Sequence, residues 1–181
     1  MNIETPLKME DISKLKSGDI VKLTGVIYTA RDAAHKELVE LIKNGKKLPF
    51  ELDGAVIYYV GPTPEKPGQI IGSAGPTTSG RMDLYTPLLL DSGLKGMIGK
   101  GSRSKEVRDS MKKNKAVYFA AVGGAAALIA KTVKSSEIIA YEELGTEAVR
   151  KLEVVDFPVI VINDIYGNDL YEDGQMVYKS V

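Results

Sequence analysis

Apolar and polar positions alternate along several short segments of the chain, and each of these segments predicts a strand. Residues 18–30 (GDIVKLTGVIYTA) begin with a turn and then alternate as a half-buried strand does. Residues 55–60 (AVIYYV) and 116–122 are short apolar runs, which predict strands. Further strands are expected at 93–101, 136–143 and 154–164, within 65–75, and near the end of the chain.

Helical periodicity separates these strands. After Thr29, the run ARDAAHKELVELIKNG places Ala34, Leu38 and Leu41 near one face, and Gly45 is the expected end of this helix. Other helices are predicted at 84–93, interrupted or bent around Pro87, at 102–114 with Ser102 or Ser104 as N-cap, from Gly124 to about Lys134, and at 145–152.

Strands and helices that alternate in this way predict a layered α/β domain. The early strands are rich in Gly and Thr and alternate in polarity, so part of the sheet is expected to be antiparallel or barrel-like. The length of 181 residues suits one domain, and we predict a single domain over 17–181 preceded by an N-terminal arm over 1–16.

Composition excludes several kinds of chemistry. The chain has no cysteine and a single histidine, His35, so it supplies neither thiolate ligands nor a multi-histidine metal site. Its 24 Lys and Arg residues balance 24 Asp and Glu residues, so no basic field favours nucleic acid. No apolar run approaches the roughly 20 residues of a membrane span, and the N-terminus has no signal-peptide core, so we expect a cytoplasmic protein without membrane contact.

Three segments share one plan, in which an apolar strand leads through glycines into a helix start. They are GSAGPTTSGR, GKGSRS and VGGAAAL. The first turn of a helix exposes unpaired N–H groups at the positive end of its dipole, which favours an anion. In the first segment Thr77 and Thr78 add hydroxyl donors, although Thr78 or Ser79 is also suited to a purely structural N-cap.

Cations accompany these turns. Arg81 offers a planar fork that matches a carboxylate or a phosphate, and Lys100 places a point charge between two glycines. Arg31, at the start of the first long helix, is expected at the same rim. A single cation is more often a solvated surface charge. Lys100 is less well explained in this way, because a flexible loop of glycines gains nothing from a lysine that only faces solvent.

Residue chemistry alone leads to a small-anion site and no further. GKGSRS lacks the spacing of a Walker A motif, and no G-x-G-x-x-G follows the first strand. The anion is therefore a carboxylate or a phosphate, and no reaction follows from the residues by themselves.

The motifs taken together resemble class I fumarate hydratase, specifically its β subunit or C-terminal domain, over roughly residues 18–173. The L(+)-tartrate dehydratase β subunit belongs to the same family. The segments that carry the resemblance are ARDAAHKEL, YYVGPTP, GSAGPTTSGRMD, KGMIGKG, YFAAVGGAAALIAK, AYEELGTEAVRKLEVVDFP and GNDLY, in this order.

This resemblance implies a swivelling β/β/α domain with a mixed sheet and glycine-rich strand-to-helix turns. It implies a hydro-lyase that interconverts fumarate and (S)-malate and is active only with an α subunit, in an α2β2-like heteromer. It further implies that three cysteines of the α subunit hold a 4Fe–4S cluster with one iron open to the substrate. A cysteine-free chain is then expected to be the β half of a two-chain enzyme.

The resemblance also implies roles for matched residues. Arg31, Thr77, Arg81 and Lys100 correspond to residues that contact the dicarboxylate substrate, and Thr78 corresponds to a threonine proposed to transfer a proton. An unperturbed alcohol is a weak base, so an aspartate of the α subunit is an alternative for that step. Two other functions remain open: an L(+)-tartrate dehydratase β subunit, and a non-catalytic module that binds an anion or assists assembly.

Overall fold

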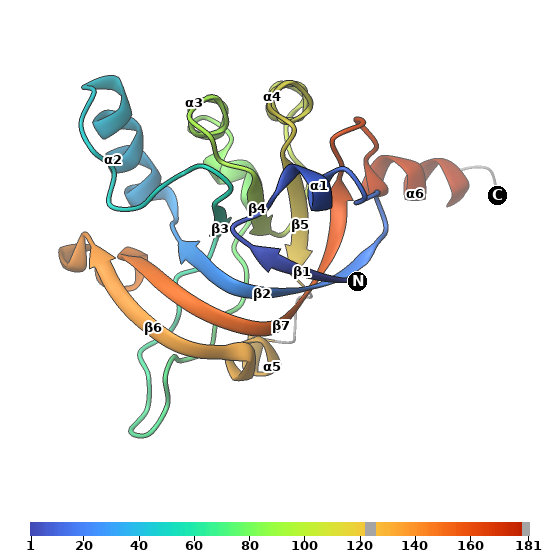
Figure 1. Ribbon diagram of the computed structural model, residues 1–181. Coiled ribbons are helices and arrows are strands. Elements are labelled where there is room, and N and C mark those ends of the chain that lie inside the picture. The colour runs from blue at the N-terminus through green and yellow to red at the C-terminus, as the bar shows by residue number, and fades with distance from the viewer. Residues whose placement is uncertain (122–125, 179–181) are drawn as a thin grey trace.

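The structure is a computed structural model that describes residues 1–121 and 126–178. Its strands form one mixed sheet of seven strands in the order β1-β2-β3-β4-β5-β7-β6 (Figure 1). The strands are β1 (Asn2–Thr5), β2 (Ile20–Thr29), β3 (Val56–Tyr58), β4 (Gly96–Gly99), β5 (Val117–Ala121), β6 (Val133–Ala140) and β7 (Val149–Asn163). The helices are α1 (Met9–Ile12), α2 (Asp32–Lys43), α3 (Thr86–Asp91), α4 (Lys105–Asn114), α5 (Ala126–Thr132) and α6 (Leu170–Tyr178), with 3-10 helices η1 (Ser79–Met82) and η2 (Glu142–Glu147).

The sheet closes into a small barrel. Strands β2, β3, β4 and β5 run parallel to one another. The long strand β7 is antiparallel to β5 and also to β2, so it joins the two ends of this parallel set. Strands β1 and β6 extend the sheet outside the ring. The expectation of a partly antiparallel or barrel-like sheet is therefore confirmed.

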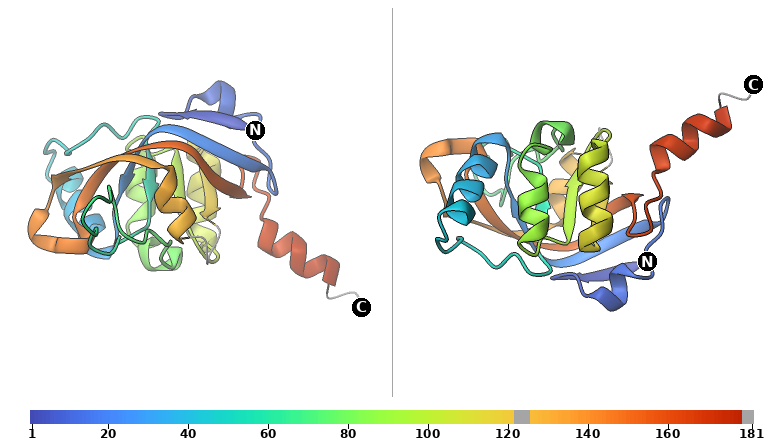
Figure 2. Two further views of the ribbon diagram at one scale, coloured as in Figure 1. Left: turned by 90° about the horizontal axis from the view of Figure 1, so that it is seen from below. Right: turned by 90° about the horizontal axis from the view of Figure 1, so that it is seen from above.

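Two hydrophobic cores use opposite faces of the same strands. Val56 and Tyr58 of β3 belong to the core inside the barrel, whereas Ile57 and Tyr59 belong to the core beneath the helices. Helices α2, α3 and α4 lie side by side on that outer face of the sheet, as Figures 1 and 2 show. Because both faces of β3 are buried, its sequence is continuously apolar rather than alternating.

Several predicted elements are found at their expected positions, among them β2, α2, β3, α4 and β5. Of the two predicted caps of α4, Ser104 is the one used, because its hydroxyl oxygen accepts the Val107 N–H at 3.3 Å. Pro87 lies in the first turn of α3, where no N–H is needed from that residue, and the helix begins at Thr86 rather than at the expected Leu84.

Three predictions of secondary structure were wrong. The helix expected at 145–152 is absent, because β7 begins at Val149 and pairs with β2 on one side and β6 on the other. The described backbone forms no strand within 65–75. The strand expected near the chain end is helix α6, whose start is capped by Asp169 Oδ1, which accepts the N–H of Tyr171 at 2.9 Å and of Glu172 at 3.4 Å. The glycine turn at 123–124 lies outside the described residues.

Residues 1–16, expected as an arm, contribute to the barrel. Strand β1 pairs in parallel with β2, and four apolar side chains of this segment are buried in the inner core: Ile3, Leu7, Ile12 and Leu15. Gly25 has φ +123°, and a Cβ on it would lie 2.6 Å from the Thr5 carbonyl oxygen. A glycine is therefore required where β1 crosses close to β2.

Candidate functional site

The residues predicted to bind an anion lie at one edge of the barrel. Arg31 follows β2, and Lys100 follows β4, so both lie at the carboxyl ends of the parallel strands. Between them, β3 leads into Gly61, and a Cβ on Gly61 would lie 3.0 Å from Arg31 Nη1. In open α/β sheets, ligands bind at the carboxyl ends of parallel strands, and the same edge carries the candidate residues here.

Backbone hydrogen bonds bring Thr77 and Thr78 beside Lys100. Thr78 and Lys100 form a parallel β-bridge outside the named strands. The Lys100 N–H donates to the Thr77 carbonyl at 3.2 Å, and the Ser79 N–H donates to the Lys100 carbonyl at 2.9 Å. The Thr77 N–H donates to the Tyr59 carbonyl at 2.7 Å, which ties this short ladder to the end of β3.

The two arginines are linked through acidic residues that the sequence analysis did not identify. Arg81 Nε donates to Asp32 Oδ1 at 2.9 Å, and Arg31 Nη2 lies 3.8 Å from Asp32 Oδ2. Arg31 Nη2 also pairs with Glu147 Oε1 at 3.2 Å. The other Glu147 oxygen accepts the Ala33 N–H at 3.1 Å, so Glu147 holds both the arginine and the first turn of α2.

These contacts join all five predicted site residues into one region. The segment 77–81 carries both threonines at one end, next to Lys100, and Arg81 at the other end, next to Asp32 and Arg31. Lys100 is exposed and Arg81 is half exposed, so cationic groups face outward from this edge. The region can therefore bind a small anion that reaches it from outside the chain.

Helix geometry contributes less to this site than the sequence predicted. Thr78 occupies the N-cap position of η1, a 3-10 helix of four residues, and its hydroxyl caps no N–H of that helix. So short a helix has almost no macrodipole. Attraction for an anion therefore depends on the arginine and lysine side chains, and the threonine hydroxyls are left for other contacts.

Close backbone packing explains one glycine beside Lys100. A Cβ on Gly99 would collide with the Ser79 hydroxyl oxygen. That hydroxyl is buried and lies 2.8 Å from the Tyr118 hydroxyl, so it has no room to move aside. On the other side of Lys100, Gly101 has φ +80°, a left-handed conformation that glycine adopts without strain.

His35, the single histidine, is a buried residue of α2. Its Nδ1 lies 2.9 Å from the Arg31 carbonyl oxygen, so Nδ1 carries the proton and donates it to that carbonyl. Nε2 is buried and has no hydrogen-bond partner among the described residues. Burial lowers the pKa of His35 from its ordinary value of 6.5 to about 4, so the ring is neutral at physiological pH.

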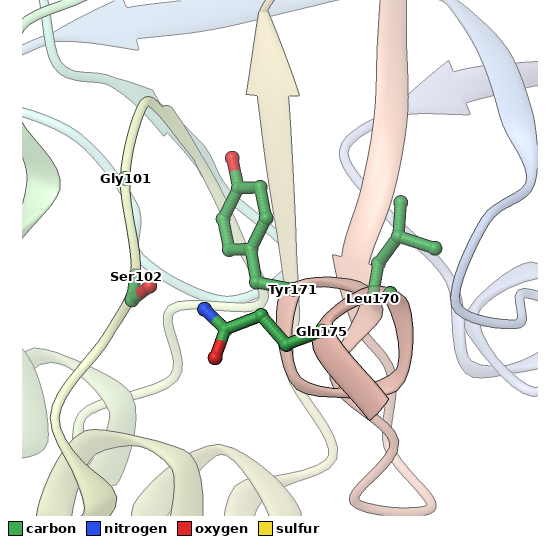
Figure 3. Close-up of a pocket in the computed structure, with 6 residues that line it drawn as sticks. Gly101, Ser102, Leu170, Tyr171 and Gln175 are labelled. Atoms are coloured by element: carbon green, nitrogen blue, oxygen red, sulfur yellow. The ribbon is translucent and has the colours of Figure 1, made fainter. Parts of the chain in front are cut away.

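A pocket of about 530 Å³ lies on the other side of the Lys100 turn, between Gly101, Ser102 and helix α6 (Figure 3). Tyr171 of α6 points past Gly101, and Leu170 and Gln175 line the remainder (Figure 3). Burial raises the pKa of Tyr171, so this phenol stays protonated in the physiological range. The pocket is mostly apolar and holds no predicted site residue.

Neither a metal centre nor a membrane span is found in the part of the chain that the structure describes. Over residues 1–121 and 126–178, no group of three or more His, Cys, Asp or Glu side chains could hold a metal ion. Within the same ranges, no helix is both long and apolar enough to cross a membrane.

The geometry defines a class: a small mixed α/β barrel domain with a cationic, hydroxyl-bearing edge for an anion. Comparison with known proteins gives the family. Residues 1–174 match the family model described as fumarase C-terminus, and the chain belongs to this family.

Three relatives illustrate the range of the family. The chain is 42% identical to a Methanocaldococcus jannaschii protein provisionally named L(+)-tartrate dehydratase subunit beta, over 97% of this chain and 93% of the relative. It is 41% identical to the anaerobic class I fumarate hydratase of Escherichia coli, over 99% of this chain and 33% of the relative. It is 42% identical to fumarate hydratase 2 of Leishmania major, over 90% of this chain and 29% of the relative. The chain thus spans about a third or less of these two hydratases and nearly the whole of the tartrate dehydratase subunit.

Proposed function

We propose that this chain is the β subunit of an iron–sulfur hydro-lyase that interconverts fumarate and water with (S)-malate. The observation that carries the proposal is the joining of Arg31, Thr77, Thr78, Arg81 and Lys100 at one edge of the barrel in a member of the fumarase family. In this proposal Arg31, Thr77, Arg81 and Lys100 bind the two carboxylates of the substrate.

The cations match the charge that the reaction develops. Removal of the C3 proton of malate builds negative charge on the adjacent carboxylate. Fixed donors aimed at this carboxylate stabilise the transition state, typically by a few kcal/mol each. Thr78 is assigned the proton transfer, and its backbone bridge with Lys100 places the two residues side by side at the proposed site.

Charge counting supports a partner at this site. Three cations (Arg31, Arg81 and Lys100) and two carboxylates (Asp32 and Glu147) leave one net positive charge. A bound dicarboxylate carries two negative charges, so these groups together would carry one net negative charge, which a positive group of a partner would offset. In the proposal this partner is an α subunit, in an α2β2-like heteromer, and this domain swivels against that subunit when substrate binds.

The iron–sulfur cluster is assigned to the α subunit. This chain has no cysteine, and its described residues offer no cluster of metal ligands, so its own residues do not fit a 4Fe–4S group. The tasks left to this chain are to bind and orient the substrate carboxylates and to move a proton.

The second candidate is an L(+)-tartrate dehydratase β subunit. It is favoured by the Methanocaldococcus jannaschii relative, which the chain matches over nearly its full length. Tartrate differs from malate by one hydroxyl group, and the same carboxylate ligands suit both acids.

Activity of the assembled enzyme tests the proposal. The chain is co-expressed anaerobically with a cluster-bearing partner, the cluster is reconstituted, and turnover of malate, fumarate and L(+)-tartrate is compared. Preferred malate and fumarate turnover supports the first function, and preferred tartrate turnover supports the second. With an intact cluster and a stable complex, no turnover of any of these acids would overturn both and favour a non-catalytic module. The isolated chain is expected to be inactive.

A further inference from the structure

A short backbone ladder joins the two segments that carry the candidate side chains. The segment with Thr77, Thr78 and Arg81 meets the segment with Lys100 through two main-chain hydrogen bonds, of 2.9 and 3.2 Å. Both segments lie outside regular strands at this point. Two such bonds do not by themselves fix side-chain positions to the precision that a catalytic site requires.

Behind this ladder lies an ion pair of a buried arginine and an aspartate whose side chain is 17% exposed. The Arg103 side chain has no exposed surface, and its Nε donates to Asp83 Oδ1 at 2.8 Å. The other Asp83 oxygen accepts the Ser104 N–H at 2.7 Å. Asp83 follows η1, and Arg103 follows the Lys100 turn, so one carboxylate joins the two segments by a side-chain contact and a backbone contact.

The remaining donors of Arg103 are also used. Nη2 donates to Thr86 Oγ1 at 2.8 Å, and Nη1 donates to the Tyr59 hydroxyl at 3.1 Å. The guanidinium carbon lies 5.2 Å from the centre of the Tyr118 ring. Arg103 therefore contacts the residue that follows β3, strand β5 and the start of α3 at once, and attraction to Tyr59 and Asp83 outweighs the effect of burial and raises its pKa.

Tyr118 supplies a third cross-link between the same two segments. Its hydroxyl donates to the Gly101 carbonyl at 2.8 Å and accepts the Ser79 hydroxyl at 2.8 Å. Gly101 is next to Lys100 in the chain, and Ser79 is next to Thr78. The cross-links therefore lie directly behind the predicted site residues.

We propose that Arg103 and Asp83 are positioning residues, which hold Thr77, Thr78 and Arg81 in register with Lys100. Arg103 is fully buried and points away from the accessible edge, so it does not touch the substrate. A buried ion pair is seldom the most stable solution for a core, because an apolar pair of similar volume is often equally or more stable. Its directed hydrogen bonds hold the two segments in register, which an apolar pair could not do. This inference rests on the proposed function.

Removal of both charges separates positioning from stability. In Arg103→Met/Asp83→Asn, the asparagine oxygen can still accept the Ser104 N–H, and no unpaired charge remains. We expect the assembled enzyme to keep its thermal midpoint within a few degrees, while kcat/KM falls at least about 10-fold, mainly through kcat. Arg103→Lys keeps one charged contact and loses the fork, so intermediate activity is expected.

The matched control is the exposed pair between α4 and the end of α3, in which Lys113 Nζ lies 2.9 Å from Asp91 Oδ1. Lys113→Met/Asp91→Asn removes the same kinds of charge at the surface and is expected to leave both kcat and KM unchanged. Equal kinetics of the control and of the buried double variant would overturn the proposal.

Amide exchange tests positioning without any turnover. In the full chain, the N–H groups of Ser79 and Lys100 are expected to exchange at least about 10-fold faster in the buried double variant, while those in the interior of α4 keep their rates. If the double variant does not fold, Arg103→Lys is measured in the same way. Unchanged exchange at Ser79 and Lys100 would overturn the proposal. An inactive wild-type complex would instead contradict the proposed function, and exchange alone would then decide the positioning role.

Discussion

Lys100 lies beside one end of the 77–81 segment and Arg81 forms its other end. The sequence identified both from their residue types and their glycine-rich surroundings. It did not identify Asp32, Glu147, Asp83 or Arg103, because carboxylates and arginines are common on protein surfaces and nothing local marks the ones that a fold buries together. Among these four residues, Asp32 had a signal in the local sequence, because it directly follows the predicted site residue Arg31. Residues that come together from distant parts of the chain could be identified only from the structure.

Replacement of the two outward cations tests the proposed site directly. Arg81→Ala and Lys100→Ala are each expected to lower kcat/KM of the assembled enzyme by about 100-fold or more, because each removes a group that the proposed function assigns as a donor to a substrate carboxylate. Steady-state kinetics on the preferred diacid measures the effect.

Lys105→Ala is the control, since Lys105 is exposed and pairs only with Asp109 on the same helix. Wild-type kinetics in both Arg81→Ala and Lys100→Ala would mean that these are ordinary surface charges.

His35 makes the stability of the protein depend on pH. Its pKa is about 4 in the folded chain and near 6.5 when unfolded, so between these values the unfolded state binds the extra proton. The folded state therefore has its full stability with respect to His35 above pH 6.5, and this contribution is lost as the pH falls from 6.5 towards 4. At pH 5.5 the free energy of unfolding is expected to be about 1.4 kcal/mol lower than at pH 7.5 on this account.

Urea unfolding of the chain at the two pH values measures this difference. His35 is the only histidine of the sequence, so His35→Gln provides the control. The variant is expected to be less stable at both pH values but to lose most of the difference between them. An equal difference in wild type and variant would assign the pH dependence to other groups.

Helices and strands with a strong hydrophobic pattern were predicted well. Those whose conformation depends on pairing with other strands in the fold were not. Helix α2 and strand β3 follow from periodicity and from a continuous apolar run. The stretch 145–152 has good helix formers, yet its second half pairs with strands on both sides, and this pairing outweighs local propensity. Helix α6 had a recognisable signal, since Asp169 and Glu172 have the spacing of a capping box.

The start of α4 gives a test at this scale. Ser104→Ala removes the hydroxyl that accepts the Val107 N–H and is expected to lower the free energy of unfolding by about 1 kcal/mol. Ser102→Ala, which changes the other serine considered as a cap, is expected to have no effect on stability. Denaturant titration of both variants decides between them, and equal losses would contradict the assignment of the cap.

For the whole molecule, the sequence predicted a layered α/β domain with a partly antiparallel or barrel-like sheet, and the structure agrees. Closure of the ring could not be predicted, because it depends on a pairing between β2 and β7 that no local pattern encodes. The position of residues 1–16 was not foreseen for the same reason. Their apolar side chains are few and scattered, and they reach the core through packing against the folded sheet, to which β1 is joined by its parallel pairing with β2.

Ile12 tests whether the first residues belong to the cooperative unit. Its side chain is fully buried, so Ile12→Ala is expected to lower the global free energy of unfolding by roughly 2–4 kcal/mol. Met9→Ala, in the same short helix but with 47% exposure, is the control and should change stability little. A small effect of Ile12→Ala would indicate an arm that detaches separately from residues 17–181.

The closing strand also has a consequence for how the protein is made. Ile20 pairs with Ile160, so the ring depends on contacts between residues far apart in the chain. Contacts of such long range slow folding, because a large loop must lose its freedom before any pairing compensates. During synthesis, a nascent chain that has emerged only as far as β5 carries every predicted substrate ligand but cannot complete the ring. The edge that carries these residues is therefore expected to take its final form only after β7 has left the ribosome.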